Sequence, residues 1–319
     1  MAKPPTIVDV AHMLGVAPST VSRAFNNPRI LKPDTVARVL AKAAELGYVP
    51  NRHAQALTTG RSGLVGLVIR DVSNPFFARA IRATQREAER LSLNAIVVEC
   101  DSDADREQRL IDRVLPQVEG LVLASTRLSA ARLTELSRRT RVVLVNSDLA
   151  GFTRVLASAS EALDQGIRLL AGAGARKLAY VGGPPYSWSE AERWGTVRRV
   201  AAERGLAVTY VSANMGTYGE GRAAAVSIAE AEVDAVVAFD DVIAHGVLDG
   251  LTILGVRVPE DVRLLGCDDA LPIETHPRLS TVRLDIEQAF VTAVRALAEG
   301  SVSGQRILVP GVLTVRETT

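Results

Sequence analysis

The sequence predicts an α/β protein in which a small three-helix head precedes a large, doubly wound body. The first 60 or so residues show helical periodicity, with helix start and stop signals at short intervals. From Gly60 onward, continuous apolar segments alternate with amphipathic ones, which is typical of parallel strands covered by helices on both faces. The length of 319 residues also exceeds what one core usually holds, so two or more domains are expected.

The near-neutral charge of the chain conceals a split between these parts. Lys and Arg number 37 and Asp and Glu 36, a formal net charge of +1. Residues 1–61 hold eight basic and three acidic groups, a net +5, which leaves −4 for residues 62–319. A basic head on an acidic body indicates that the head meets a polyanion and that the body has another task.

Composition argues against several classes of protein. No run of about 18 apolar residues is present, so no membrane partner is expected. Residues 1–5 lack the apolar core of a secretory signal peptide. Two cysteines, Cys100 and Cys267, make neither a disulfide framework nor a metal motif, so we expect no metal site and a cytoplasmic location.

Helix signals divide the head into three helices. Thr6 and Asp9 form a capping box for a first helix, which Gly15 ends. A tight turn leads to a second helix over about Pro18–Phe25, and a third covers about 33–46. The third helix is expected to turn inward Val36, Val39, Leu40 and Ala43. This is the plan of the helix-turn-helix, whose second helix enters the DNA major groove; a plain three-helix scaffold is the alternative.

A fourth helical segment of about two turns is expected between Asn51 and Gly60. Asn51 is a good N-cap and Gly60 a good residue to follow a helix end. So short a helix is unstable alone in water, so it should fold only against a partner chain and DNA.

Several short motifs of the head follow one another at specific distances along about 55 residues. They are Thr6-Ile7-Val8-Asp9-Val10-Ala11, Gly15-Val16, Ser19-Thr20-Val21-Ser22-Arg23-Ala24-Phe25-Asn26, Gly47-Tyr48-Val49-Pro50-Asn51, Ala54 and Leu57. Together they resemble the head of the lactose-repressor (LacI/GalR) family of transcriptional regulators. The resemblance implies a homodimer on a palindromic double-stranded DNA operator, with paired hinge helices in the minor groove and Leu57 wedged between base pairs.

The resemblance also implies which residues contact DNA. Pro18, Ser19 and Arg23 would face the bases, and Arg23 can donate two hydrogen bonds to guanine, worth about 1–3 kcal/mol of discrimination. Polar groups around them would contact phosphates. The expected DNA contacts are Thr6, Pro18, Ser19, Thr20, Ser22, Arg23, Asn26, Asn51, Ala54 and Leu57. Ala17 and Lys32 stand where the family often has a capping Ser, so weaker caps are expected there.

The body alternates predicted strands and helices. The strands are Leu64–Ile69, Asn94–Glu99, Gly120–Ala124, Arg141–Asn146, Lys177–Gly182, Ala207–Ser212, Asp234–Phe239, Val262–Cys267 and Leu279–Arg283. The helices include Phe76–Leu91, Ala159–Ala173, Ser189–Arg204, Asp241–Leu254 and Asp285–Gly300. No Gly-x-Gly-x-x-Gly follows the first strand and no Walker loop exists, so no nucleotide cofactor is expected.

The resemblance extends through most of the body. It implies two sheet lobes like those of periplasmic sugar-binding proteins, joined by three crossings, with a small-molecule effector in the cleft between them. The expected divisions are 1–50 for the DNA-binding head, 51–61 for the hinge and 62–319 for the effector-binding and dimerisation domain. Lobe 1 would hold about 62–157 and 286–312, and lobe 2 about 158–285 and 313–319.

Two motifs of the body supply candidate effector contacts. Asp71-x-x-Asn74-Pro75-Phe76-Phe77 follows the first strand as in many relatives, so Phe77 is expected to face the cleft and stack on a sugar ring or base; the alternative is a core phenylalanine. The stretch 187–194 resembles the one that bears the family's effector arginine. Arg193 would hold vicinal hydroxyls or a carboxylate, and one of the two tryptophans there would form an apolar wall.

Paired acids at two strand ends resemble further motifs of the family. Asp240 and Asp268 are expected to accept hydrogen bonds from effector hydroxyls, whereas Asp241 and Asp269 better fit helix N-caps. Asn146 stands where relatives often carry Asp. The expected effector contacts are Phe77, Asn146, Arg193, Asp240 and Asp268. Departures from the family pattern prevent transfer of any relative's ligand, and a neutral mono- or disaccharide is the expected class.

These observations predict a dimeric transcriptional regulator, more specifically a repressor, that responds to a sugar and is not an enzyme. Two other classes of protein share part of this pattern. A solute-binding protein of a transport system shares the body but lacks the head. A cytoplasmic sugar-processing enzyme would use the carboxylate-rich rim, but no nucleophile–base pair or metal triad accompanies it. The chain ends at Thr319 without a leucine heptad, which favours a dimer over a tetramer.

Overall fold

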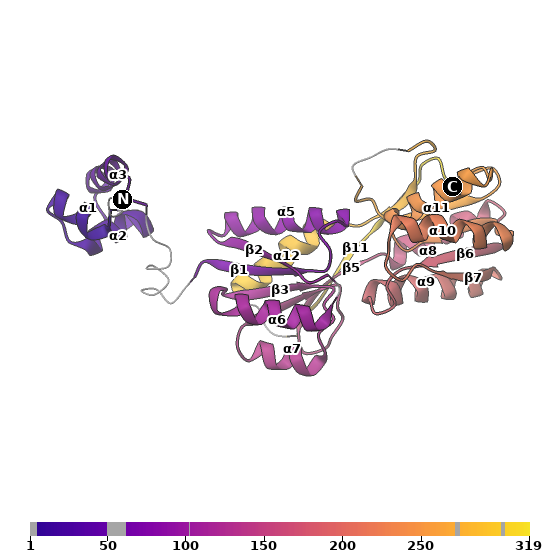
Figure 1. The fold of residues 1–319 in the computed structure, drawn as a ribbon, viewed down its shortest axis with the longest axis horizontal. Coiled ribbons are helices and arrows are strands. Elements are labelled where there is room, and N and C mark those ends of the chain that lie inside the picture. The colour runs from indigo at the N-terminus through magenta and orange to yellow at the C-terminus, as the bar shows by residue number, and fades with distance from the viewer. Residues whose placement is uncertain (1–4, 50–61, 102, 272–274, 301–303) are drawn as a thin grey trace. The chain divides into compact units, whose positions relative to one another are not determined.

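The computed structural model describes residues 5–49, 62–101, 103–271, 275–300 and 304–319 (Figure 1). These divide into two compact units, residues 1–62 and 63–319. The expected hinge contacts Asn51, Ala54 and Leu57 lie outside the described residues.

The head contains the three predicted helices, α1 (Ile7–Leu14), α2 (Pro18–Asn26) and α3 (Pro33–Leu46), and a 3-10 turn, η1 (Pro28–Ile30) (Figure 1). The capping box is formed as predicted, and Gly15 and Gly47 end their helices in the left-handed conformation. As expected, neither α2 nor α3 has a side-chain cap at its N-terminus. The buried core consists of Val10, Ala11, Val21, Ala24, Val39 and Ala43.

The expectation that Leu40 faces inward is wrong. Its exposed fraction is 42%, because the inward stripe of α3 runs through Val39, Ala43 and Leu46. At about 100° per residue, position 40 lies about a quarter turn from the middle of that stripe.

The first lobe of the body is a six-stranded parallel sheet in the order β11-β5-β4-β3-β1-β2. Its strands are β1 (Leu64–Ile69), β2 (Asn94–Glu99), β3 (Gly120–Ala124), β4 (Arg141–Val145), β5 (Thr153–Ser158) and β11 (Arg306–Pro310). Helices α5 (Pro75–Arg90) and α12 (Ile286–Glu299) cover one face (Figure 1). The other face carries α6 (Ala104–Val114), η2 (Leu115–Gln117) and α7 (Ala130–Ser137). Neighbouring residues of β1 separate accordingly: Leu67 joins the core under α5, and Val68 the core under α6.

The second lobe is a six-stranded sheet in the order β12-β10-β9-β8-β6-β7. It is parallel except for the pairing of β12 with β10. Its strands are β6 (Lys177–Gly182), β7 (Ala207–Ser212), β8 (Ala235–Ala238), β9 (Arg263–Asp268), β10 (Ser280–Arg283) and β12 (Val312–Thr314). Helices α8 (Ser160–Gly172) and α9 (Trp188–Arg204) pack together, as do α10 (Tyr218–Glu230) and α11 (Asp241–Ile253). The predicted α/β fold class is confirmed.

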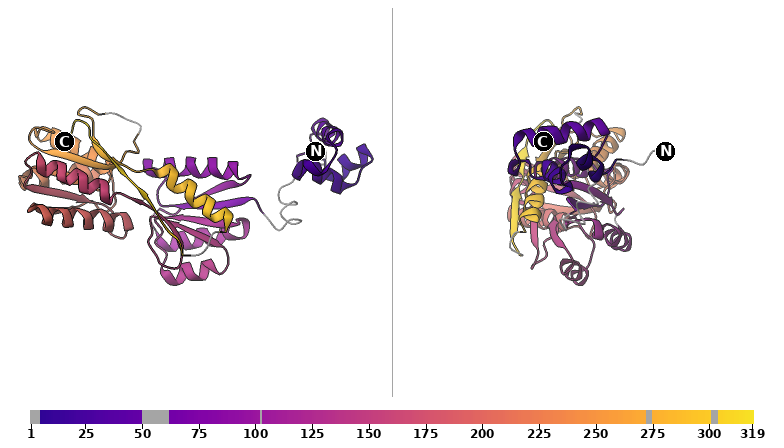
Figure 2. Two further views of the ribbon diagram at one scale, coloured as in Figure 1. Left: turned by 180° about the vertical axis from the view of Figure 1, so that it is seen from behind. Right: turned by 90° about the vertical axis from the view of Figure 1, so that its left-hand side faces the viewer.

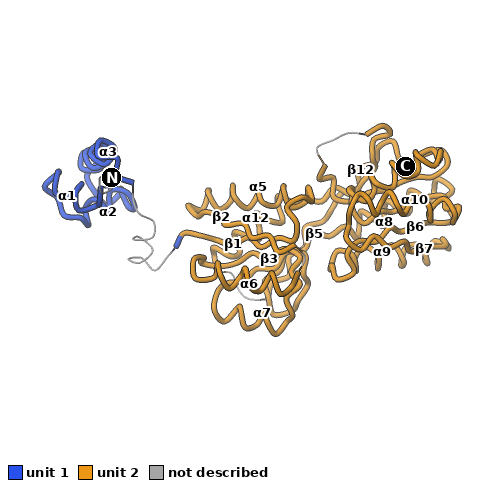
Figure 3. The backbone as a smooth tube through the Cα atoms, in the orientation of Figure 1, with its two compact units in different colours: residues 1–62 blue, residues 63–319 orange. Residues whose placement is uncertain are grey.

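Three crossings join the lobes, which together form one compact unit (Figures 2 and 3). The chain passes from β5 to α8, from β10 to α12 and from β11 to β12. The crossings lie side by side, since Gly311 N donates to Ser158 O at 2.8 Å. A Cβ at Gly311 would lie 2.8 Å from Leu284 Cδ2, so this close approach favours glycine. Val312 begins β12 in the second sheet, although the expected lobe boundary placed it in lobe 1.

Candidate functional site

Helix α2 of the head presents a polar surface. Pro18, Ser19 and Arg23 are exposed, while Val21 and Ala24 on the opposite side are buried. Thr20 and Ser22 are half-buried, and the Asn26 side-chain amide donates to Ser22 Oγ at 3.2 Å. The residues expected to read bases are therefore the ones whose side chains can reach a partner.

Thr6, unlike the residues of α2, is hydrogen-bonded within the capping box of α1. Its hydroxyl donates to Asp9 Oδ2 at 2.7 Å and accepts from Asp9 N at 3.4 Å. Thr6 thus has a structural role as the cap of α1, and its DNA contact stays a prediction.

A pocket lies between the two lobes. Six residues from lobe 1 line it, and so do six from lobe 2: Arg70, Asn74, Phe76, Phe77, Ser125, Asn146, Ser187, Ser189, Arg193, Phe239, Asp240 and Asp268. Arg70, Ser125, Asn146 and Phe239 directly follow a strand, and Asp268 is the last residue of one, so these five lie at the carboxyl edge where open α/β sheets bind ligands. This edge is the natural site for an effector because two such edges face each other across the cleft.

The pocket brings together all five expected effector contacts, Phe77, Asn146, Arg193, Asp240 and Asp268. Seven further lining residues were not predicted as contacts: Arg70, Asn74, Phe76, Ser125, Ser187, Ser189 and Phe239. Their signal in the sequence is position alone, since each follows a predicted strand or lies inside a quoted motif. The effector-binding roles themselves stay predictions.

Aromatic side chains wall the pocket, but neither tryptophan lines it. Phe76, Phe77 and Phe239 provide the apolar surface instead. Trp194 stacks on Tyr180 with ring centroids 5.2 Å apart and belongs to the packing of lobe 2. The expected tryptophan wall is therefore wrong, because α9 turns the Trp194 ring toward β6 and β7. Phe77 is both a core residue, with 3% exposure, and a pocket residue.

Arg193 is the centre of a bonded network on the lobe 2 wall. Its guanidinium donates to Asp268 Oδ1 at 2.7 Å and to the carbonyl of Phe239, and it lies 4.6 Å from the Phe239 ring centroid. Arg193 is 2% exposed and Asp268 6% exposed, so this ion pair is buried. Burial raises the pKa of Asp268, and the adjacent guanidinium opposes that shift.

The roles of the paired acids differ from the expected ones. Asp240, not Asp241, is the N-cap of α11: its backbone is extended, and its Oδ1 accepts from Ile243 N at 2.9 Å. Asp241 is the first helical residue and accepts from Thr281 Oγ1 at 2.6 Å. Both carboxylate oxygens of Asp269 accept from Nη2 of Arg316, at 2.9 and 3.0 Å, and Asp269 caps no helix.

Asp240 also faces the opposite lobe. Its Oδ2 accepts from Asn74 Nδ2 at 3.4 Å, and Asn74 in turn caps α5 through Phe76 N. Burial, followed by the nearby Asp268 carboxylate, raises the pKa of Asp240 to about 6. One hydrogen bond between two helix caps therefore joins the walls of the cleft.

The lobe 1 wall is less bonded. Arg70 follows β1, is 9% exposed and lies 5.9 Å from the Phe77 ring centroid. Across the described ranges, no hydrogen bond or ion pair to its guanidinium is present. Asn146 adopts the left-handed conformation (φ 52°), and its Oδ1 accepts from Ala157 N at 2.9 Å, so the amide is fixed at the edge of the pocket.

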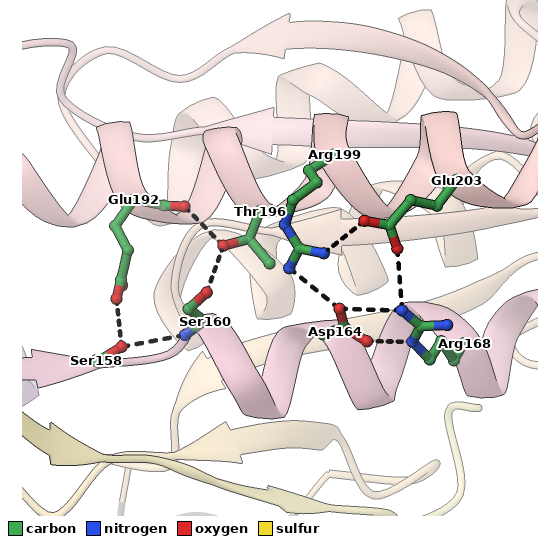
Figure 4. Close-up of polar contacts among 8 residues, drawn as sticks. All are labelled: Ser158, Ser160, Asp164, Arg168, Glu192, Thr196, Arg199 and Glu203. Carbon is green, nitrogen blue, oxygen red and sulfur yellow. Dashed lines mark hydrogen bonds and ion pairs between the residues drawn. The ribbon is translucent and has the colours of Figure 1, made fainter.

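A second polar network connects α9 to a crossing between the lobes (Figure 4). Glu192, next to the pocket arginine, accepts from Ser158 Oγ and from Ala159 N at 3.2 Å. Thr196 Oγ1 donates to the Glu192 carbonyl at 2.9 Å and pairs with Ser160 Oγ at 2.9 Å. The same helix therefore carries both a pocket residue and the side chain that holds the chain where it enters lobe 2.

In the part of the chain that the structure describes, no group of three or more His, Cys, Asp or Glu is placed to hold a metal ion. The described helices also include none that is long and apolar enough to cross a membrane. Cys267, at the end of β9, is fully buried, and burial raises the pKa of its thiol well above the usual value.

Comparison with known families agrees with both parts of the architecture. Residues 6–51 match the bacterial regulatory proteins of the lacI family, and residues 167–319 match the periplasmic binding protein-like domain. The chain thus joins a DNA-binding head of the lacI family to a periplasmic binding protein-like domain. The resemblance seen in the head and body motifs is thereby confirmed.

Individual LacI-family relatives match nearly the whole chain. The HTH-type transcriptional regulator GalS of Salmonella typhimurium is 29% identical over 306 residues, 93% of this chain and 90% of the relative. A crystal structure of the Lac repressor dimer bound to operator and the anti-inducer ONPF is similar with a TM-score of 0.89, at 24% identity and 99% coverage of both chains. A complex of the transcriptional regulator CelR with cellobiose has a TM-score of 0.73, at 26% identity, and covers 99% of this chain and all of its own.

Proposed function

We propose that this LacI-family chain is a transcriptional repressor that binds a palindromic operator as a homodimer and is controlled by a sugar-like effector in the cleft. The observation that carries the proposal is the coexistence of an exposed reading surface on α2 with a pocket lined equally by two lobes. The similar Lac repressor structure is a dimer on operator DNA, and the similar CelR structure holds cellobiose, which support this assignment.

Coupling between effector and DNA would act through the angle between the lobes. Asn74 and Asp240 already form a hydrogen bond across the cleft, and an effector seated beside them would favour one lobe arrangement over another. Because the crossings also fix the position of lobe 1, such a shift changes whether two hinge segments meet in a dimer. The wedge role of Leu57, with Asn51 and Ala54 beside it, belongs to this proposal.

The cleft carboxylates support binding rather than catalysis. Asp240 caps a helix, Asp241 is bonded to Thr281 and Asp268 is paired with Arg193. Each acid is thus committed to a protein partner, whereas a general acid–base pair needs groups directed at substrate. We therefore propose a cytoplasmic DNA-binding protein without catalytic activity and without a cofactor.

Selection of binding sites from random DNA tests the proposal. The wild-type chain should enrich a palindrome, and Arg23→Ala should lower its preference for that site over scrambled DNA by about tenfold or more, since a bidentate arginine–guanine contact contributes about 1–3 kcal/mol. Affinities would be measured by fluorescence anisotropy at one fixed salt concentration, because phosphate contacts make affinity strongly salt-dependent.

Arg38→Ala is the matched control. Arg38 lies exposed on α3, so its removal takes the same charge from the head without touching α2. It should weaken binding to both DNAs alike. Equal preference in wild type and Arg23→Ala would remove Arg23 from base reading, and a chain that enriches no site at all would overturn the proposed function.

A further inference from the structure

Arg70 is a cation in the pocket wall that makes no hydrogen bond or ion pair with any other residue that the structure describes. It is 9% exposed, lies behind the carboxyl end of β1 and lines the pocket beside Phe77 and Ser125. Within the described segments, its one specific contact is with the Phe77 ring, at 5.9 Å from guanidinium carbon to centroid. Its nitrogens are not among the described polar atoms that are sealed from solvent without a partner, so its donors open onto the pocket.

The acids of the cleft form no ion pair with Arg70. Asp268 is already paired with Arg193 at 2.7 Å. Asp240 uses one carboxylate oxygen for the Ile243 amide and the other for the Asn74 amide. Neither acid is within 4.0 Å of the Arg70 guanidinium nitrogens, since no such ion pair is present between these described residues.

The other pocket arginine is in the opposite state. Arg193 donates to the Phe239 carbonyl and to Asp268, and its remaining Nε is sealed from the cleft. Two of the Arg193 donors are therefore committed to the protein, whereas the Arg70 donors have no hydrogen-bond partner among the described residues. They face a pocket that otherwise offers hydroxyls, from Ser125, Ser187 and Ser189, and carboxylates.

We propose that the effector is an acidic sugar, a hydroxyl-rich small molecule with a carboxylate or phosphate group that binds Arg70. This inference rests on the proposed function and specifies its ligand, in place of the neutral sugar expected from the sequence. A planar anion pairs with the guanidinium fork through two hydrogen bonds. The ligand hydroxyls then lie toward Asp240 and Asp268 on the other wall, and the Phe77 ring lies beside the sugar.

Burial makes this charge pattern favourable. Because burial raises the pKa of Asp240 to about 6, the pocket gains positive character as the pH falls through that value. An anion on Arg70 would neutralise that charge, whereas a neutral sugar would leave the guanidinium without an anionic partner. The same reasoning predicts that the anionic group, more than the stereochemistry of the ring, decides whether a ligand binds.

The test measures ligand-induced melting shifts and calorimetric affinities for matched sets of sugars. Each set holds a neutral sugar, its aldonate and its 6-phosphate: glucose, gluconate and glucose 6-phosphate, then the galactose and ribose counterparts, with ribose 5-phosphate in the last set. At least one anionic member should bind the wild-type chain, and its neutral counterpart should bind at least about tenfold more weakly. Comparison of aldonates with phosphates identifies which anion the site takes.

Variants assign the anion to Arg70. Arg70→Gln should weaken the anionic ligand by about tenfold or more and bring it level with the neutral one, and Arg70→Lys should recover part of the loss. Arg82→Gln, on the exposed side of α5, removes the same charge outside the pocket and should change nothing. Melting temperatures without ligand verify that each variant is folded.

Two results would overturn the inference. One is a panel in which no anionic member binds the wild-type chain. The other is a neutral sugar that binds as tightly as its acid, with Arg70→Gln affecting neither. Failure of the proposed function shows separately, as the absence of any selected DNA site, so the two failures are distinguishable.

Discussion

The two walls of the cleft each hold one buried arginine, and they hold it differently. On lobe 2, Arg193 is paired with Asp268, bonded to a carbonyl and packed on Phe239. On lobe 1, the one specific contact of Arg70 among the described residues is with the Phe77 ring. The lobe 2 wall is therefore assembled without ligand, while the lobe 1 wall presents a charge to be met from the cleft. One wall maintains the fold of the pocket, and the other provides the driving force for filling it.

The largest expected effect comes from removing the lobe 2 arginine. Arg193→Met leaves the Asp268 carboxylate buried and unpaired, which should lower the free energy of unfolding by about 3–5 kcal/mol. Arg70→Met breaks no ion pair among the described residues and should cost about 1 kcal/mol or less. Urea unfolding followed by circular dichroism, without ligand, measures both values.

Arg199→Met is the control for Arg193→Met. Arg199 lies on the exposed side of the same helix and pairs with Asp164 and Glu203 at the surface (Figure 4). Its removal should leave the urea midpoint nearly unchanged. If Arg70→Met and Arg193→Met lower stability equally, the contrast between the two walls is wrong.

An intermediate effect is expected from pH, through Asp240. Its pKa is raised to about 6, above the ordinary 3.8, so the folded chain holds this proton more tightly than the unfolded chain does. Protonation therefore stabilises the fold, and that stability is lost as the pH rises through about 6. A shift of this size corresponds to about 3 kcal/mol between the extremes.

The difference between wild type and Asp240→Asn isolates this effect. Melting temperatures from pH 5 to 8 should fall with rising pH more steeply for the wild type, because the amide cannot ionise and still accepts from Ile243 N. Parallel curves for the two proteins would show that Asp240 stays ionised throughout this pH range. The lobe 2 wall would then keep its full negative charge.

The sequence predicted the head more fully than the cleft, for a physical reason. Caps such as Thr6, Gly15 and Gly47 act within one helical turn, so local spacing was enough to place α1, α2 and α3. Leu40 was misplaced because the exact phase of a helix depends on which neighbours it packs against. Strands β5, β11 and β12 escaped prediction. Of these, β11 and β12 are edge strands, in which half-exposed residues such as Ile307 and Leu313 break the continuous apolar pattern of a central strand.

The pocket shows the same limit. Motifs gave Arg193, Asp240 and Asp268, which the structure places together, but not the choice between Asp240 and Asp241 as the cap. That choice depends on the residue at which α11 begins, and a one-residue shift exchanges the two roles. Arg70 carries no motif of its own. Arg70 stands out because no described residue forms a hydrogen bond or ion pair with it, and this can be seen only in the folded chain.

The smallest expected effect concerns Glu192, where the lobe 2 wall continues into a crossing. Its carboxylate accepts from Ser158 Oγ and Ala159 N, both at the end of β5. Glu192→Gln keeps the size of the side chain but offers one acceptor oxygen, so it should lower stability by about 1 kcal/mol, or a few degrees in melting temperature. Glu203 lies at the surface of the same helix, where it pairs with Arg199, so Glu203→Gln should change the melting temperature less (Figure 4). If Glu192→Gln leaves the melting temperature unchanged, the backbone hydrogen bond from Gly311 to Ser158 is enough to hold the crossing. The stabilising network of the lobe 2 wall would then not extend beyond Arg193.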